Sequence, residues 1–400
     1  LYKITMSPGQ FLHIVVKQLG IDVAVALSTP DGKKVAESDI EHVRGRSETV
    51  SVISELAGSY LIEVRSPEKT AKPGLYEIKA EELRVASAED RHRVAGDVLF
   101  REAGQLKGGT LEAKRKAIEK YHEALELYRR ASYPKGEADT LNNIGTVHRS
   151  LGEIQKALEK FNEALPIRRA AGDRGGEGDT LNNIGLIHLS RGDMKKALEK
   201  HNEAFHIFRE VGDRSGEANA LINIGIDYRS LGDMQKALEM HNEALPIFRE
   251  VGNRRGEANT LTNIGVAYYS LGEMQKALEN YNGALSIFQE VGNPRGEAAA
   301  LSNIGIVYYT LGDMRKALEK HNEALPIIRK VGDRNGEANT LTNIGVVHLS
   351  LGELRKALEK YNEALQIKRA IGDRYGEAAM LHNIGEVYYS LGDMRKALEE

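Results

Sequence analysis

The stretch Leu141-Asn142-Asn143-Ile144-Gly145 decides the fold of this chain. It returns as Leu-x-Asn-Ile-Gly beginning at residues 181, 221, 261, 301, 341 and 381, at a constant step of 40 residues. Self-similarity at a fixed period of this size is typical of repeat architectures. Six complete repeats run from Gly136 to about Tyr375, and a seventh begins at Gly376. We therefore expect a solenoid, in which each repeat packs on its neighbours.

Each repeat is predicted to form two helices. In the first repeat Leu141, Ile144 and His148 follow one another at spacings of three and four, which places them on one helical face. Gly152 is suited to the left-handed position that ends a helix, and Asp173 is a good N-cap for the next repeat. A second apolar face follows Gly152 and consists of Ile154, Ala157, Leu158, Phe161, Ala164 and Leu165.

Small residues recur where two helices must approach closely. Gly145 and its equivalents lie inside the first helix, where glycine costs about 1 kcal/mol against alanine, so its recurrence implies a packing reason. Prolines at positions 166, 246 and 326 fall inside the second helix. Because the apolar spacing continues past them, we expect each proline to bend the helix rather than end it.

The combined pattern resembles the tetratricopeptide repeat. It runs Leu141, Ile144, Gly145, His148, Ala157, Phe161 and Ala164, and recurs in every repeat. The 40-residue step is longer than the usual ~34 residues, so the chain is similar to the long-repeat branch of this family. The resemblance implies an all-α, right-handed superhelical solenoid whose first helices line a concave side, spanning residues 136–400. Residues 85–135 are predicted to hold a linker and a degenerate first repeat.

Residues 1–84 differ in character and are predicted to form a small antiparallel β-sandwich. Short β-rich runs alternate there with turn signals such as Pro30-Asp31-Gly32 and Ala57-Gly58. The expected strands are 11–18, 21–28, 49–55, 59–66 and 75–80. This segment resembles the sandwich that precedes tetratricopeptide arrays in bacterial proteins ending in a caspase-like CHAT peptidase domain. Because the chain stops at Glu400, in the middle of a second helix, we expect it to be a fragment.

Composition excludes several functional classes. The net charge is −3, from 55 basic and 58 acidic residues, which argues against a general nucleic-acid binder. The absence of cysteine rules out disulfides, thiolate nucleophiles and cysteine-based zinc sites. No apolar run is long enough to span a bilayer, and no signal-peptide pattern opens the chain. The compartment stays open; the resemblance implies a bacterial protein, cytoplasmic or exported.

Six of the twelve histidines are predicted to be packing residues, and the other six are scattered without metal-ligand spacing. His201, His241 and His321 occupy the position of Phe161, Tyr281 and Tyr361, and His148, His188 and His348 replace tyrosines of other repeats. The glycine-rich run 172–178 lacks the Lys-Ser/Thr ending of a phosphate loop. We therefore expect no catalytic residue, no metal site and no cofactor in this fragment.

An asparagine ladder is the strongest candidate for a binding site. It consists of Asn143, Asn183, Asn223, Asn263, Asn303, Asn343 and Asn383. Each amide offers a donor and an acceptor, which suits the backbone of an extended peptide. In long-repeat relatives an asparagine at this position grips bound peptide, so the resemblance implies the same role. The alternative is that the amides bond between adjacent helices and align the repeats.

An apolar track is expected three residues after each asparagine. Its members are Leu186, Ile226, Val266, Ile306 and Val346, and further along lie Arg229, Tyr269 and Tyr309. Aromatic and arginine side chains are typical of binding hot spots. Lys and Arg do not occupy the positions 142, 182, 222, 262, 302 and 342, where chaperone-binding relatives clamp a carboxylate, so binding of chaperone tails is not expected.

Three functions are compatible with these features. The first is a protein-interaction scaffold that holds an extended peptide or a helix of a partner protein in the concave groove. The second is the sensor arm of a larger CHAT-type peptidase with its catalytic domain beyond residue 400. The third is a passive spacer. Partner identity and oligomeric state are not encoded in any motif found.

Overall fold

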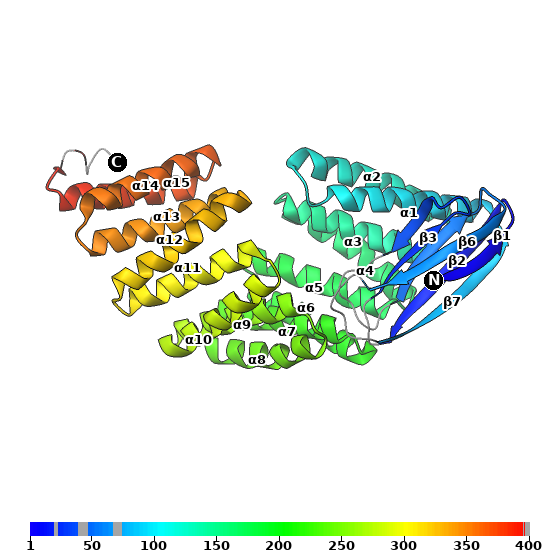
Figure 1. The fold of residues 1–400 in the computed structure, drawn as a ribbon, viewed down its shortest axis with the longest axis horizontal. Coiled ribbons are helices and arrows are strands. Elements are labelled where there is room, and N and C mark those ends of the chain that lie inside the picture. Colours follow the sequence, from blue (N-terminus) through cyan, green and yellow to red (C-terminus); the bar gives the residue numbers. More distant parts are fainter. Residues whose placement is uncertain (20–22, 39–46, 67–73, 395, 397–400) are drawn as a thin grey trace. The chain divides into compact units, whose positions relative to one another are not determined.

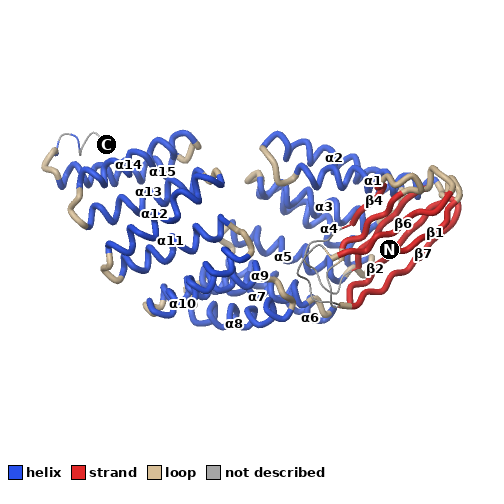
Figure 2. Tube along the Cα trace, in the orientation of Figure 1, coloured by secondary structure: helices blue, strands red, loops and turns tan. Residues whose placement is uncertain are grey.

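The computed structural model describes residues 1–19, 23–38, 47–66, 74–394 and 396. These residues form seven β-strands followed by fifteen α-helices (Figures 1 and 2). They divide into an N-terminal body, residues 1–233, and a C-terminal body, residues 234–400, which are described separately.

The strands form two antiparallel sheets, as the sequence predicts for this segment. Their bounds are β1 Tyr2–Met6, β2 Gln10–Leu19, β3 Ala24–Ser28, β4 Lys34–Ser38, β5 Ser47–Ile53, β6 Gly58–Arg65 and β7 Leu75–Val85. One sheet has the order β1-β6-β3-β4 and the other β5-β2-β7. Leu12, Ile14, Val25, Val50 and Tyr60 belong to the apolar core between them. Positions 21 and 22 of the expected strand 21–28 lie outside the described residues.

Two strands of the structure are not among those predicted from the sequence. The strand β1 pairs antiparallel with β6, with Ile4 opposite Tyr60. The strand β4 pairs with β3, and its register shifts between Leu27 and Ser28. Both are five residues long and lie at the edges of their sheet. Short edge strands carry only a few residues of alternating pattern, so the sequence signal is weak.

Helices fill the remainder of the described chain in hairpin pairs. In the N-terminal body they are α1 Ala88–Leu106, α2 Leu111–Arg130, α3 Pro134–Ser150, α4 Ile154–Ala170, α5 Arg174–Ser190, α6 Met194–Val211 and α7 Arg214–Ser230. In the C-terminal body they are α8 Met234–Glu250, α9 Arg254–Ser270, α10 Met274–Glu290, α11 Pro294–Thr310, α12 Met314–Val331, α13 Arg334–Ser350, α14 Leu354–Ala370 and α15 Arg374–Ser390. The odd-numbered members from α3 onward are the first helices of the 40-residue repeats.

The recurrent glycine of the first helix has the packing role that its recurrence implies. A Cβ atom on Gly145 would lie 2.7 Å from the ring of Phe161. On Gly345 it would lie 2.5 Å from the ring of Tyr361. No real Cβ atom tolerates such a contact, so the aromatic ring of the second helix requires glycine opposite it. Gly152, with φ at 76°, ends α3 in the left-handed conformation, as expected.

The second helices run through their prolines. Pro166 lies within α4, Pro246 within α8 and Pro326 within α12, and each helix remains one continuous element. The expectation that these prolines do not end their helices is therefore confirmed.

Candidate functional site

The asparagine ladder lies on the first helices, and every member is half-buried. In the N-terminal body Asn183 donates to the amide oxygen of Asn142 at 3.2 Å. Asn223 likewise donates to Asn182 at 2.8 Å. These bonds join successive first helices. Asn183 and Asn223 therefore bond between adjacent helices, the arrangement that the alternative to ligand binding describes.

The first member of the ladder is also engaged. The Asn143 amide donates to the carbonyl oxygen of Asp139 at 2.9 Å, within α3. Its own side-chain oxygen accepts from Lys107 at 3.2 Å. The contact with Lys107 ties α1 to α3.

The asparagines of the C-terminal body have a different environment. The acceptor position occupied by Asn142 and Asn182 holds Thr262, Ser302 and Thr342 in later repeats. The hydroxyls of Thr262 and Thr342 donate to carbonyls of their own helices, at 3.0 and 2.8 Å. No hydrogen bond joins the side chains of Asn263, Asn303, Asn343 or Asn383 to any described residue. These amides are therefore available to a ligand.

The apolar track follows the same face of the C-terminal body. Val266, Ile306 and Val346 are half-buried, as are Leu186 and Ile226 of the N-terminal body. The track is thus neither part of the closed core nor fully exposed to water.

Aromatic side chains join the first helices of the C-terminal body. The hydroxyl of Tyr269 lies 3.1 Å from that of Thr310. The hydroxyl of Tyr309 lies 3.0 Å from that of Ser350. Both rings are half-buried, as is Arg229 in the N-terminal body. These contacts link α9 to α11 and α11 to α13.

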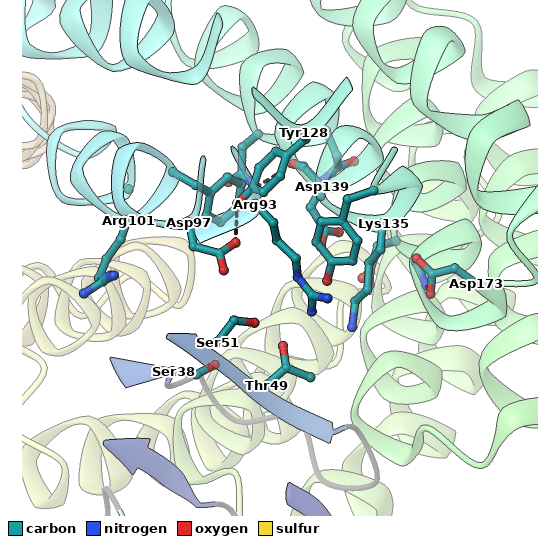
Figure 3. A pocket seen from close by; sticks show the side chains of 18 of the residues that line it. Ser38, Thr49, Ser51, Arg93, Asp97, Arg101, Tyr128, Lys135, Asp139 and Asp173 are labelled. Carbon is teal, nitrogen blue, oxygen red and sulfur yellow. Dashed lines mark hydrogen bonds between the residues drawn. The ribbon is translucent and has the colours of Figure 1, made fainter. Parts of the chain in front are cut away.

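A second candidate site lies within the N-terminal body, between the sandwich and the helices. It is a pocket of about 1070 Å³ lined by residues of β4, β5 and the helices α1 to α6 (Figure 3). We call it the junction pocket. The side chains that bear on its chemistry are Ser38, Thr49, Ser51, Arg93, Asp97, Arg101, Lys135, Asp139 and Asp173.

Arg93 is held in the junction pocket by aromatic and histidine contacts. Its guanidinium lies 4.2 Å from the centre of the Tyr133 ring and 5.8 Å from that of Phe11, both in the cation–π range. Its Nη2 lies 3.1 Å from Nδ1 of His13. Burial and the neighbouring Arg93 lower the pKa of His13 to about 4, so this imidazole is neutral at pH 7 and can accept from the guanidinium.

Two carboxyl groups line the same pocket. Asp97 accepts from the Tyr128 hydroxyl at 2.7 Å, and burial raises the pKa of Asp97. Asp139 accepts from Arg168 at 2.8 Å, and burial likewise raises the pKa of Asp139. Arg168 also donates to Asp173. Both pKa shifts indicate that water is partly excluded from this part of the molecule.

Sequence reasoning missed the junction pocket, although a weak signal for it exists. Asp139 and Asp179 stand four residues before their asparagines, where later repeats carry asparagine or alanine. Arg168 stands where Phe208, Phe248 and Phe288 occur. Such departures mark a site that differs from the repeat consensus. Arg93 could not have been found in this way because α1 lies in the degenerate repeat.

The histidines occupy the packing positions predicted for them. His201, His241 and His321 are at most 2% exposed. Among the described residues no cluster of histidine, aspartate and glutamate is placed to hold a metal ion. Within the same part of the chain, none of the helices has the length and apolar character needed to cross a membrane.

Comparison with solved structures places the helices among known solenoids. The chain is 16% identical to the apo form of the quorum sensor NprR from B. thuringiensis, with a TM-score of 0.61, covering 79% of this chain and 86% of that one. It is 18% identical to a STAND protein with a tetratricopeptide repeat sensor from Pyrococcus horikoshii, with a TM-score of 0.56 and coverage of 78% and 52%. Aspartyl phosphate phosphatase F from Bacillus subtilis is 14% identical, with a TM-score of 0.54 and coverage of 78% and 82%. At these identities the likeness concerns the fold.

Sequence comparison identifies the repeat itself. No curated protein matches the chain at a significant level. The family model described as tetratricopeptide repeat matches residues 111–170, 177–250, 256–330, 297–370 and 336–400, which together exceed half of the chain. Its matched segments coincide with the helical hairpins α2–α15. The chain therefore belongs to the tetratricopeptide repeat family.

Proposed function

We propose that this chain is a protein-interaction module that binds an extended peptide segment of a partner along the first helices of its C-terminal body. The observation that carries this proposal is the set of unpartnered amides on Asn263, Asn303 and Asn343. A polar group that is half-buried and unpaired gains from a ligand that supplies its missing hydrogen bond.

The chemistry of this surface suits a peptide backbone. An extended strand presents N–H and C=O groups in alternation, and each amide side chain can meet both. The adjoining Val266, Ile306 and Val346 offer apolar contact to side chains of the peptide, and Tyr269 and Tyr309 are anchoring residues of the kind enriched in hot spots.

The experiment is a selection from a random peptide library with matched variants. The test variant carries Asn263→Ala, Asn303→Ala and Asn343→Ala. The control carries Asn282→Ala, Asn322→Ala and Asn362→Ala, three exposed asparagines on second helices of the same body. A peptide selected on the wild type should bind the test variant about tenfold or more weaker and the control unchanged, since each net hydrogen bond is worth about 1 kcal/mol.

Methylated peptides separate backbone recognition from side-chain recognition. N-methylation of alternate amides of the selected peptide should weaken its binding to the wild type. The same methylation should lower its affinity for the test variant only slightly further. Unchanged affinity of the test variant, with a lowered free energy of unfolding, would show that the ladder is structural in this body also.

A second candidate is a sensor arm of a larger protein. It is favoured by the folds of the quorum sensor NprR and of the sensor-bearing STAND protein. The particular form expected from the sandwich, an arm of a CHAT-type peptidase, requires a His/Cys catalytic pair in the gene beyond residue 400. Sequencing that region tests it directly.

A further inference from the structure

We infer that the junction pocket binds an α-carboxylate, meaning a carboxylate group with an N–H donor on the neighbouring carbon. A free amino acid and the C-terminal residue of a peptide share this chemistry. The site lies within the N-terminal body and is independent of the surface of the C-terminal body discussed above.

Two cations in the pocket form no ion pair at salt-bridge distance, although Asp97 interacts electrostatically with Arg93 and Asp139 with Lys135. No ion pair links Arg93 or Lys135 to any carboxylate of the described residues. Figure 3 shows both side chains extending into the same space, on the side where Thr49 lies. Two like charges that face one space in a partly desolvated site repel each other. An anion placed between them would replace this repulsion by two charge-assisted hydrogen bonds.

The first turn of α3 adds a backbone donor to these cations. In the next repeat the side chain of Asp173 caps its helix by accepting from the backbone N–H of Gly176 at 3.0 Å. Helix α3 has Tyr133 at this position and no side-chain cap. The N–H of Gly136, which lines the pocket, therefore finds no acceptor among the described residues. A helix N-terminus of this kind favours negative charge.

The carboxyl groups of the pocket limit what the anion can be. Asp97 and Asp139 line the pocket but form no ion pair with Arg93 or Lys135. Burial raises the pKa of each carboxyl group. A multiply charged anion such as phosphate would be repelled by them. A ligand with a single carboxylate and an adjacent N–H donor fits both kinds of group. Its carboxylate contacts the cations, and its N–H group donates to an aspartate.

The test uses three defined probes in equilibrium dialysis with quantification by mass spectrometry. They are an equimolar mixture of the twenty amino acids, a random tripeptide pool with free C-termini, and the same pool amidated. We expect binding of the first or the second probe and none of the third beyond background. Binding of amino acids identifies the free ligand, and binding of the free-acid pool alone identifies a peptide end.

Charge-removing variants assign the bound ligand to the pocket. Lys135→Gln should weaken binding about tenfold or more, because a charge-assisted hydrogen bond is lost. Arg93→Gln should do the same, but it also removes ring contacts. Lys135 is therefore the main test residue, since it is exposed and forms no hydrogen bond or ion pair at salt-bridge distance with a described residue. Lys195→Gln, at an exposed position on α6, is the matched control and should bind as the wild type does.

Three results would overturn the inference. They are equal binding of the free and amidated pools, unchanged affinity of Lys135→Gln, and no binding of any probe. Displacement of the ligand by inorganic phosphate at lower concentration than by acetate would also contradict it, because the pocket would then prefer a dianion. Circular dichroism spectra of all variants establish that each is folded.

Discussion

His201 on α6 and Asp227 on α7 form a fully buried hydrogen-bonded pair. Nδ1 of the imidazole lies 2.5 Å from Oδ2 of the carboxylate, and both side chains are 0% exposed. Burial raises the pKa of Asp227. Three other repeats place Phe or Tyr and an apolar residue at these two positions, for example Tyr281 and Val307. The pair therefore replaces an ordinary packing contact with a buried polar one.

Replacing one member of this pair should lower the free energy of unfolding far more than replacing both. His201→Tyr leaves the Asp227 carboxylate buried without a partner, and we expect it to lower the free energy of unfolding by about 3–5 kcal/mol. The double variant His201→Tyr with Asp227→Val carries the residues found at Tyr281 and Val307. Its free energy of unfolding should equal or exceed that of the wild type. Urea denaturation of the four proteins of this cycle measures the coupling. Additive effects of the two substitutions would show that the pair is not coupled.

Arg168 offers a similar comparison in α4. It is 4% exposed, and it bonds Asp139 and Asp173. Arg168→Ala should cost about 3 kcal/mol, because it leaves a cavity and removes the partner of desolvated carboxylates. Arg168→Phe refills the volume, as Phe208 does in the next repeat, but also removes the partner of the two carboxylates, so it should cost about 1–2 kcal/mol less than the alanine variant. Thermal unfolding of both variants tests this. A phenylalanine variant as unstable as the alanine one would mean that the charge, not the volume, is required.

Protonation of His321 should destabilise the C-terminal body. Burial lowers the pKa of His321 from its ordinary 6.5 to about 4. Between these two pKa values the unfolded chain binds the proton more readily than the folded chain does. The contribution of neutral His321 to the stability of the fold is therefore complete above pH 6.5 and is lost as the pH falls towards 4. The loss at low pH is up to about 3 kcal/mol.

His321→Tyr is the variant that tests this effect. Tyr281 and Tyr361 occupy the same position in neighbouring repeats. Its free energy of unfolding should equal that of the wild type at neutral pH and exceed it at about pH 5. Denaturant melts at the two pH values measure the difference. A constant difference between the two proteins across this range would contradict the assignment.

Ser132 holds a left-handed conformation that every later repeat assigns to glycine. Its φ is 48°, and the equivalent Gly172 has a φ of 67°. A side chain in this region costs roughly 1–2 kcal/mol, partly offset by the greater freedom of glycine in the unfolded chain. Ser132→Gly should therefore raise the free energy of unfolding by about 1 kcal/mol or less. The reverse change, Gly172→Ser, should lower it, and a stabilising Gly172→Ser would refute the explanation.

The repeat architecture was readable from sequence because its determinants are local. Leu141 and Ile144 repeat at helical spacing, and Gly152 ends its helix in the left-handed conformation. The requirement for Gly145 was also visible as a costly residue that recurs, although the ring opposite it, Phe161, became certain only in three dimensions. Five strands of the sandwich were indicated by composition, and the edge strands β1 and β4 were not.

The hydrogen-bond partner of each asparagine in the ladder was not predicted from the sequence. Asn183 and Asn303 occupy the same register, yet Asn183 is bonded to a neighbouring helix and Asn303 is not. The difference depends on a residue about 40 positions away, which the repeat brings alongside. The residue pattern within a single helix therefore does not predict this difference in hydrogen bonding.

The sequence by itself determined that this chain is a tetratricopeptide solenoid behind a small β-sandwich, because helix periodicity, caps and turn residues act over a few positions. Only the tertiary structure decided which charged groups come together in space. Arg93, Lys135 and Asp97 line one pocket because β5 of the sandwich packs beside α1. Electrostatic interactions depend on distance in space and on exclusion of water, and both are properties of the packed chain rather than of its order of residues.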